Sequence, residues 1–130
     1  MTWLVDTHLL LWAAVGSPRL PSTARRLLEN DPVLFSSASL WEMSIAPGLG
    51  RQGFDVDVAR LRRGLLENGY AELPITGRHA VVAGELPSHH VDPFDRMLIA
   101  QAIAEDVTLL TSDTALSAYD GPIHLVSARR

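Results

Sequence analysis

Short apolar runs alternate with helix-like segments along the whole chain, and this alternation constrains the fold more than any other feature. Three runs are clear predicted strands, at Trp3–Val5, Val33–Ser36 and Val107–Thr111. Two weaker strands are expected at Ala71–Ile75 and Ile123–Val126. Strands that alternate with helices are typical of a parallel sheet with helices on both faces. The sequence therefore predicts a doubly wound α/β fold with four to five strands.

The helix-like segments have apolar residues three and four positions apart. Predicted helices span residues 7–14, 21–30, 39–46, 58–68, 76–85 and 92–106, with a short one at 112–118. Asp92-Pro93 marks the clearest start, because aspartate is a preferred N-cap and proline suits the first turn. Residues 47–54, which hold three glycines and a proline, and residues 86–91 are expected to be loops.

Composition excludes several classes of protein. The chain has 130 residues, 47% apolar and 20% charged, which predicts one globular domain over residues 1–130. It has no cysteine, which excludes disulfide scaffolds, zinc ribbons and thiol nucleophiles. Its 11 basic residues are all arginine. A P-loop needs a lysine at the phosphates and a Schiff base needs a lysine amine, so both are excluded.

The charge and the N-terminus bear on partners and location. A net charge of −4 gives no overall basic field, so any contact with nucleic acid must come from local arginines or metal ions. The run Trp3–Val5 stops at Asp6 and no basic residue precedes it, unlike a signal peptide. No apolar run is long enough to span a membrane. We expect a cytoplasmic protein with no membrane partner.

Acidic residues follow two predicted strands and open two predicted helices. Asp6 closes the first strand and Asp113 lies just beyond the strand that ends at Thr111, while Glu42 and Asp95 lie near helix starts. The carboxyl ends of parallel strands form the ligand crevice of such a sheet. Each acid taken alone has a structural explanation, since Glu42 has capping-box spacing and Asp95 and Asp113 suit helix starts.

Taken together, the acids predict a metal site. Converging carboxylates repel one another, and burying the unpaired charge of Asp6 at the end of an apolar run is costly. A divalent cation supplies the counter-charge, and oxygen ligands select hard ions such as Mg²⁺ or Mn²⁺. Such an ion can activate a water for attack on a phosphodiester.

Other polar and aromatic features predict less. The pair His89-His90 is expected to be solvated rather than metal-bound, and Trp12 and Trp41 are expected in the core. A basic cluster within residues 60–63 is expected to be a solvated helix face, with phosphate positioning as the alternative.

Four segments in order resemble PIN-domain ribonucleases, and more closely the VapC-type toxins of bacterial toxin–antitoxin pairs. They are Leu4–Trp12, Ser37–Glu42, Asp92–Ala102 and Leu109–Asp113, and the resemblance runs from about residue 3 to residue 126. It implies a PIN-like doubly wound sandwich, cleavage of RNA with Mg²⁺ or Mn²⁺, a homodimer and a cognate antitoxin that blocks the site.

The resemblance also implies roles for particular residues. The acidic positions of the family match Asp6, Glu42 and Asp95, with Asp113 as the fourth and Thr111 as the hydroxyl residue that supports the site. Asp6, Asp95 and Asp113 would hold the metal, and Glu42 would ligate it or orient the attacking water. Relatives often carry a basic residue shortly after the glutamate, whereas this chain has none at 45–48.

Two rival functions stay open on the sequence alone. One is a catalytically silent PIN-like binding module, which the presence of all four acids disfavours. The other is a metal-dependent phosphatase on a similar sheet, which the Asp6-Thr7-His8 sequence and the absent lysine disfavour.

Overall fold

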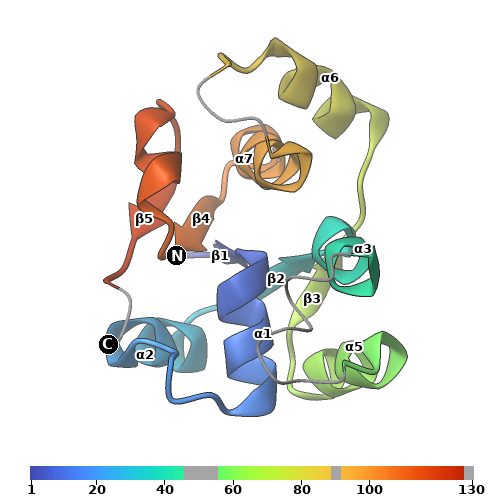
Figure 1. Ribbon diagram of the computed structural model, residues 1–130, viewed down its shortest axis with the longest axis vertical. Helices are drawn as coiled ribbons and strands as arrows, with labels where there is room; N and C mark the ends of the chain where they lie inside the picture. The colour runs from blue at the N-terminus through green and yellow to red at the C-terminus, as the bar shows by residue number, and fades with distance from the viewer. Residues whose placement is uncertain (46–55, 89–91, 128–130) are drawn as a thin grey trace.

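A five-stranded parallel sheet forms the centre of the computed structural model, which describes residues 1–45, 56–88 and 92–127. The strands lie in the order β3-β2-β1-β4-β5, and every neighbouring pair is parallel (Figure 1). Their bounds are β1 Trp3–Val5, β2 Val33–Ser36, β3 Ala71–Leu73, β4 Thr108–Thr111 and β5 Ile123–Leu125. The α/β class and the five-stranded parallel sheet that the sequence predicted are confirmed.

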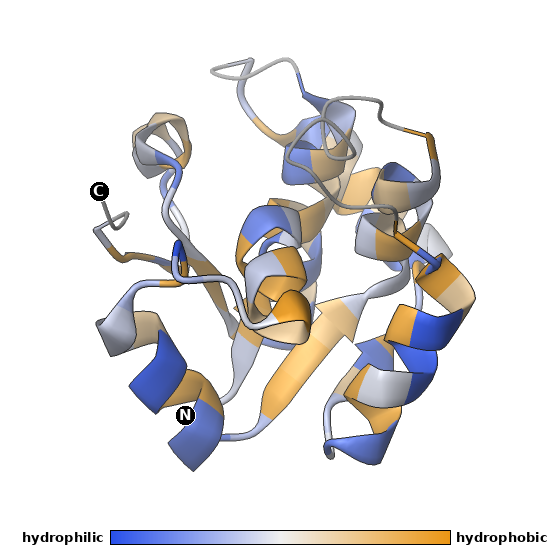
Figure 2. Cartoon of the chain, turned by 60° about the horizontal axis from the view of Figure 1, so that its bottom comes forward, coloured by the Kyte–Doolittle hydropathy of each residue, from blue (hydrophilic) through white to orange (hydrophobic). Residues whose placement is uncertain are grey.

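Helices cover both faces of the sheet. They are α1 Thr7–Val15, α2 Ser22–Asn30, α3 Ser37–Ile45, α5 Val58–Glu67, α6 Gly77–Glu85 and α7 Pro93–Glu105, with the 3₁₀ helix η1 at Thr114–Ala118. Alternate residues of β1 separate the two apolar cores, since Trp3 and Val5 pack on one face and Leu4 on the other. The central strands are strongly hydrophobic, and the outer helices carry polar stretches (Figure 2).

The central strand β1 has a partner on each side. Trp3 pairs in register with Val33 of β2 and with Thr108 of β4, so three carboxyl ends finish at the same edge. The chain leaves β1 in one direction through β2 and β3 and returns on the other side through β4 and β5. This reversal of strand order creates the crevice in which open α/β sheets bind ligands.

Some boundaries differ from the sequence predictions. α3 begins at Ser37, directly after β2, rather than at Ser39. Ser36 Oγ accepts a hydrogen bond of 3.0 Å from the amide of Ala38 and satisfies an early donor of this helix. The capping box expected between Ser39 and Glu42 is therefore wrong. The predicted loop at 47–54 and the pair His89-His90 lie outside the described residues.

Within the described part of the chain, no helix is both long and apolar enough to cross a membrane.

Candidate active site

Asp6 sits at the carboxyl edge of the sheet, where β1 ends and α1 begins. It is the N-cap of α1, and its Oδ1 accepts a hydrogen bond of 2.8 Å from the amide of Leu9. Its Oδ2 accepts a hydrogen bond from the Thr111 hydroxyl at the end of β4. Thr111 Oγ1 in turn accepts one of 3.0 Å from the amide of Asp113. One hydroxyl thus joins two of the candidate acids across neighbouring strands.

Burial makes the charge of Asp6 costly. The side chain is 5% exposed, and desolvation raises the pKa of its carboxyl group above the ordinary value. The hydrogen bonds from Thr111 and Leu9 oppose that rise, as does the nearby His8, whereas the charge of Asp113 adds to it. The site therefore favours a bound proton on Asp6 or a cation beside it.

Glu42 is a second candidate carboxylate, and one of its oxygens lacks a hydrogen-bond partner within the described part of the chain. It is half-buried on α3, and its Oε1 is buried with no hydrogen-bond partner among the described residues. Burial raises the pKa of Glu42, the charges of Asp92 and Asp6 add to the rise, and Thr7 and His8 oppose it. An orphaned buried carboxylate oxygen is unusual in a folded protein, because such atoms are normally paired.

The start of α7 carries the candidate acid Asp95 and the capping residue Asp92. Asp92 is the N-cap, and its Oδ1 accepts from the amides of Phe94 at 2.9 Å and Asp95 at 3.4 Å, as the sequence predicted. Asp95 is half-buried in the first turn. Asp92 is more than a cap, since its charge also raises the pKa of Glu42.

The donor chemistry fits a hard divalent cation, although a complete ligand cage is not preformed. Among the residues that the structure describes, no group of three or more His, Asp or Glu side chains is arranged to hold a metal ion. The buried Oε1 of Glu42 and the buried carboxylate of Asp6 are nevertheless the anionic oxygens that Mg²⁺ or Mn²⁺ prefers. These two residues could hold an ion, with Asp95 and Asp113 on neighbouring segments.

One aromatic residue was predicted in the wrong place. Trp12 is buried as expected, but the side chain of Trp41 is 61% exposed. Glu42 turns inward from α3, and the adjacent position on a helix points about 100° away from it. Trp41 and Ile45 thus form an exposed apolar strip on α3 beside the acids. Helical periodicity alone could have placed Trp41 outside once Glu42 was placed inside.

The basic cluster at residues 60–63 is a solvated helix face, as expected. Arg60 and Arg63 are exposed, and Arg62 makes a two-pronged pair with Glu72, at 2.7 Å and 3.1 Å. This pair raises the pKa of Arg62 and lowers that of Glu72.

The burial of one histidine and its contacts were not predicted from the sequence. His79 is fully buried, its Nδ1 accepts from the amide of Thr76 at 3.1 Å, and its Nε2 lies 2.9 Å from Glu105. These contacts join the start of α6 to α7. The threonine three residues before His79 is a capping signal that could have suggested the first contact.

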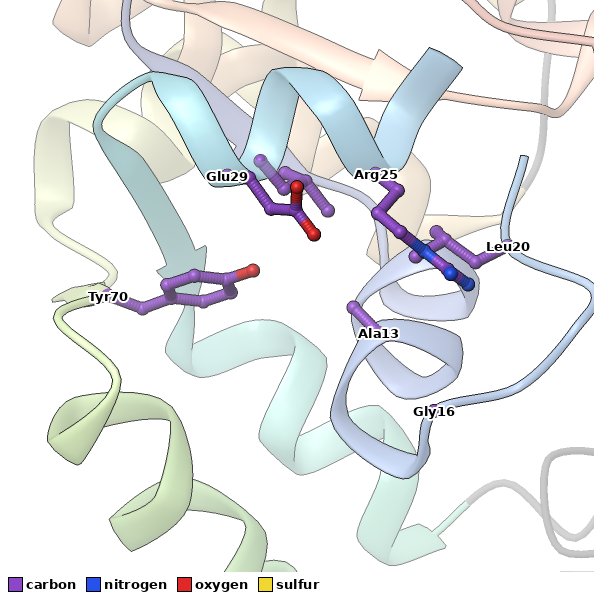
Figure 3. A pocket seen from close by; sticks show the side chains of 7 residues that line it. Ala13, Gly16, Leu20, Arg25, Glu29 and Tyr70 are labelled. Atoms are coloured by element: carbon purple, nitrogen blue, oxygen red, sulfur yellow. The ribbon is translucent and has the colours of Figure 1, made fainter. Parts of the chain in front are cut away.

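A cavity of about 310 Å³ lies away from the acids (Figure 3). It is lined by Ala13, Gly16, Leu20, Arg25, Leu28, Glu29 and Tyr70. Gly16 ends α1 and Tyr70 precedes β3, so the cavity lies at the amino edge of the sheet, opposite Asp6. None of the candidate acids lines it.

Acidic residues at the carboxyl edge of a five-stranded parallel sheet can be compared with the sites of known protein families. The family model for the PIN domain matches residues 3–122. The chain belongs to the PIN-domain family. No curated protein sequence matches this PIN domain closely enough to count as a relative.

Solved structures agree on the fold of this PIN domain. VapBC2 from Rickettsia felis, bound to a DNA fragment from its promoter, has a TM-score of 0.68 at 17% identity, covering 99% of this chain and 100% of that one. FitAcB from Neisseria gonorrhoeae has a TM-score of 0.65 at 18% identity, covering 93% and 95%. VapC20 from Mycobacterium tuberculosis, a toxin that cleaves the sarcin-ricin loop, has a TM-score of 0.63 at 22% identity, covering 89% and 93%. Membership of the PIN-domain family is therefore confirmed, and the fold is that of the VapC-type structures.

Proposed function

We propose that this PIN domain is a metal-dependent endoribonuclease and the toxin of a type II toxin–antitoxin pair. The observation that carries the proposal is the unmet demand for positive charge at the carboxyl edge, where Asp6 is buried and Glu42 has an orphaned oxygen. A cation would meet that demand, and a cation held by carboxylates can support hydrolysis of a phosphodiester such as that of RNA.

Each acid has a proposed role. Asp6, Asp95 and Asp113 hold the ion, and Glu42 either joins them or orients the attacking water. Thr111 keeps Asp6 and Asp113 at a fixed separation through its two hydrogen bonds. When bound, Mg²⁺ or Mn²⁺ lowers the pKa of a water and stabilises the negative charge that develops on the phosphate.

The partners follow from the same proposal. The substrate is RNA, and the inhibitor is a cognate antitoxin protein. We also propose a homodimer in the cytoplasm. The exposed strip at Trp41 and Ile45 on α3 is apolar surface that a protein partner could cover.

The experiment pairs two active-site changes with a matched control. Asp6→Asn and Glu42→Gln should each lower cleavage of an RNA substrate by roughly 10² or more, the range for a lost transition-state contact. Asp57→Asn is the control, because Asp57 also caps a helix but is exposed on α5. Full cleavage by Asp6→Asn at every Mg²⁺ and Mn²⁺ concentration would contradict the proposal.

A silent binding module is the second candidate function. The lack of a preformed ligand group among the described acids favours it. Calorimetry with Mn²⁺ separates the two functions, since the nuclease should bind the ion and lose binding in Asp6→Asn, whereas the silent module should bind none in either form.

A further inference from the structure

The guanidinium of Arg96 joins three segments of the fold, two of which carry candidate acids. Arg96 lies on α7, directly after Asp95. Its Nη2 donates to the carbonyls of Ala83 at 2.8 Å and Leu86 at 3.1 Å, at the end of α6. Its Nη1 donates to the carbonyl of Pro87 at 2.9 Å and to the hydroxyl of Tyr119 at 3.4 Å, just after η1. Figure 1 shows α6 and η1 on different sides of α7.

The partners of Arg96 within the described residues are neutral oxygens. Within the described residues, no carboxylate lies within ion-pair distance of its guanidinium. α6 has no basic residue in its own last turn. The final carbonyls of a helix lack internal partners and carry partial negative charge, so a cation stabilises them. Arg96 supplies that cation from the neighbouring helix.

This arrangement leaves little of the guanidinium for RNA. Each terminal nitrogen has two N–H groups, and the four contacts use both nitrogens. A guanidinium that binds phosphate needs such a pair of donors free. Arg96 is therefore placed to hold the protein together rather than to hold the substrate.

The segments that Arg96 joins are those that carry two of the candidate acids. Asp95 lies in the first turn of α7, one residue before Arg96. Asp113 caps the start of η1, accepting from the amide of Ala115 at 3.0 Å, and Tyr119 follows the end of the same helix. Holding Tyr119 against α7 thus fixes η1 relative to the turn with Asp95.

We propose that Arg96 is a positioning residue that sets the relation between Asp95 and Asp113 by tying η1 and the end of α6 to α7. This inference rests on the proposed function for its effect on catalysis, but its structural part stands without it. Loss of the hydrogen bonds of Arg96 should make the positions of Asp95 and Asp113 less fixed and leave the contacts with RNA intact.

Hydrogen exchange tests the structural part directly. The variants are Arg96→Gln, which removes the charge, and Arg96→Lys, whose single ammonium cannot span four acceptors. Arg78→Gln is the matched control, since Arg78 is exposed in the first turn of α6. In Arg96→Gln, amides in 83–88, 92–96 and 113–119 should lose protection while those in 3–15 and 58–67 keep it. Protection of these amides in Arg96→Lys should lie between that in Arg96→Gln and that in the parent protein. The control should show the protection of the parent protein.

Kinetics and metal binding test the functional part. A displacement of about 1 Å at a reacting group costs up to about 10²-fold, so kcat should fall ten- to a hundredfold in Arg96→Gln. The Mn²⁺ concentration for half-saturation in calorimetry should rise, and the KM for RNA should stay within about twofold. Partial recovery of kcat in Arg96→Lys is expected.

The outcomes separate the two proposals. Unchanged protection in 83–88, 92–96 and 113–119, or equal loss along the whole chain, would overturn the positioning role. A rise in KM with unchanged kcat would also overturn it and indicate a phosphate contact. If the parent protein neither binds Mn²⁺ nor cleaves RNA, the proposed nuclease fails, and the exchange pattern alone decides whether Arg96 positions these segments.

Discussion

Thr111 is the residue on which the geometry of the acids depends most directly. Its hydroxyl has one hydrogen, which it donates to Asp6 Oδ2, and its oxygen accepts from the amide of Asp113. Both contacts are fixed by the ends of neighbouring strands, so the hydroxyl cannot turn without breaking one of them. The hydrogen bond also lowers the pKa of Asp6 against the effect of burial.

Thr111→Val removes that hydroxyl and keeps the side-chain shape. We expect a loss of about 1–3 kcal/mol in the free energy of unfolding, because the buried carboxylate of Asp6 and the backbone amide of Asp113 each lose a partner. The pKa of Asp6 should rise further, so the acidic limb of the pH–activity profile should move to higher pH. Urea unfolding and the pH profile measure the two effects. Thr108→Val, on the same strand, should leave the profile unchanged.

Asp6 itself should make the metal-free protein less stable as the pH rises. Its pKa in the folded state lies above the ordinary 3.8, so the folded protein binds the proton more tightly than the unfolded chain does. The stability is fully present below 3.8 and is lost as the pH rises through the raised folded-state pKa. Asp6→Asn should remove this loss, which is limited to about 1.4 kcal/mol per pH unit for one proton.

Urea unfolding in EDTA across this pH range measures that slope. Asp57→Asn should keep the slope of the parent protein, because Asp57 is exposed. An identical slope in Asp6→Asn and the parent would show that burial of Asp6 does not govern its titration.

At the scale of elements, the first turn of α7 separates a capping role from a chemical one. Asp92 accepts hydrogen bonds from backbone amides, while Asp95 is the third residue of the helix. Asp92→Ala should cost about 1 kcal/mol of stability and leave most of the cleavage activity. Asp95→Ala should abolish cleavage and metal dependence at little cost in stability.

Melting curves and RNA cleavage at saturating Mg²⁺ and Mn²⁺ compare the two variants. An inactive Asp92→Ala beside an active Asp95→Ala would reverse the assignment. Asp92→Asn keeps the cap but removes the charge. Its cleavage activity therefore shows whether cleavage depends on the charge beside Glu42.

The elements were largely predictable because their signals are local. The runs at Trp3–Val5 and Val33–Ser36 and the cap at Asp92 depend on neighbouring residues only. The start of α3 was missed because β2 passes directly into the helix, so no loop or turn residue marks the boundary. The contacts of Arg96 and His79 were missed because their partners lie on other elements. The four acids were singled out, but their mutual geometry depends on strand order.

For the whole molecule, the excess negative charge at one edge predicts stabilisation by metal. An ion that binds the folded state only should stabilise it by about 2.7 kcal/mol at a hundred times its Kd. Mn²⁺ should raise the melting temperature by several degrees, EDTA should reverse the rise, and Asp6→Asn should show little of it. Equal shifts in Asp6→Asn and the parent would place the ion elsewhere.

The bond between Asp6 and Thr111 spans 105 positions in the sequence, which has a consequence for synthesis. β1 is made first, yet its neighbour β4 is among the last strands to leave the ribosome. Long-range parallel pairing forms late, because closure of so large a loop must precede it. A nascent chain therefore carries Asp6 before the strand that bears its partner Thr111. If the proposed function holds, translation of this protein should yield no nuclease activity until residues 108–113 have emerged.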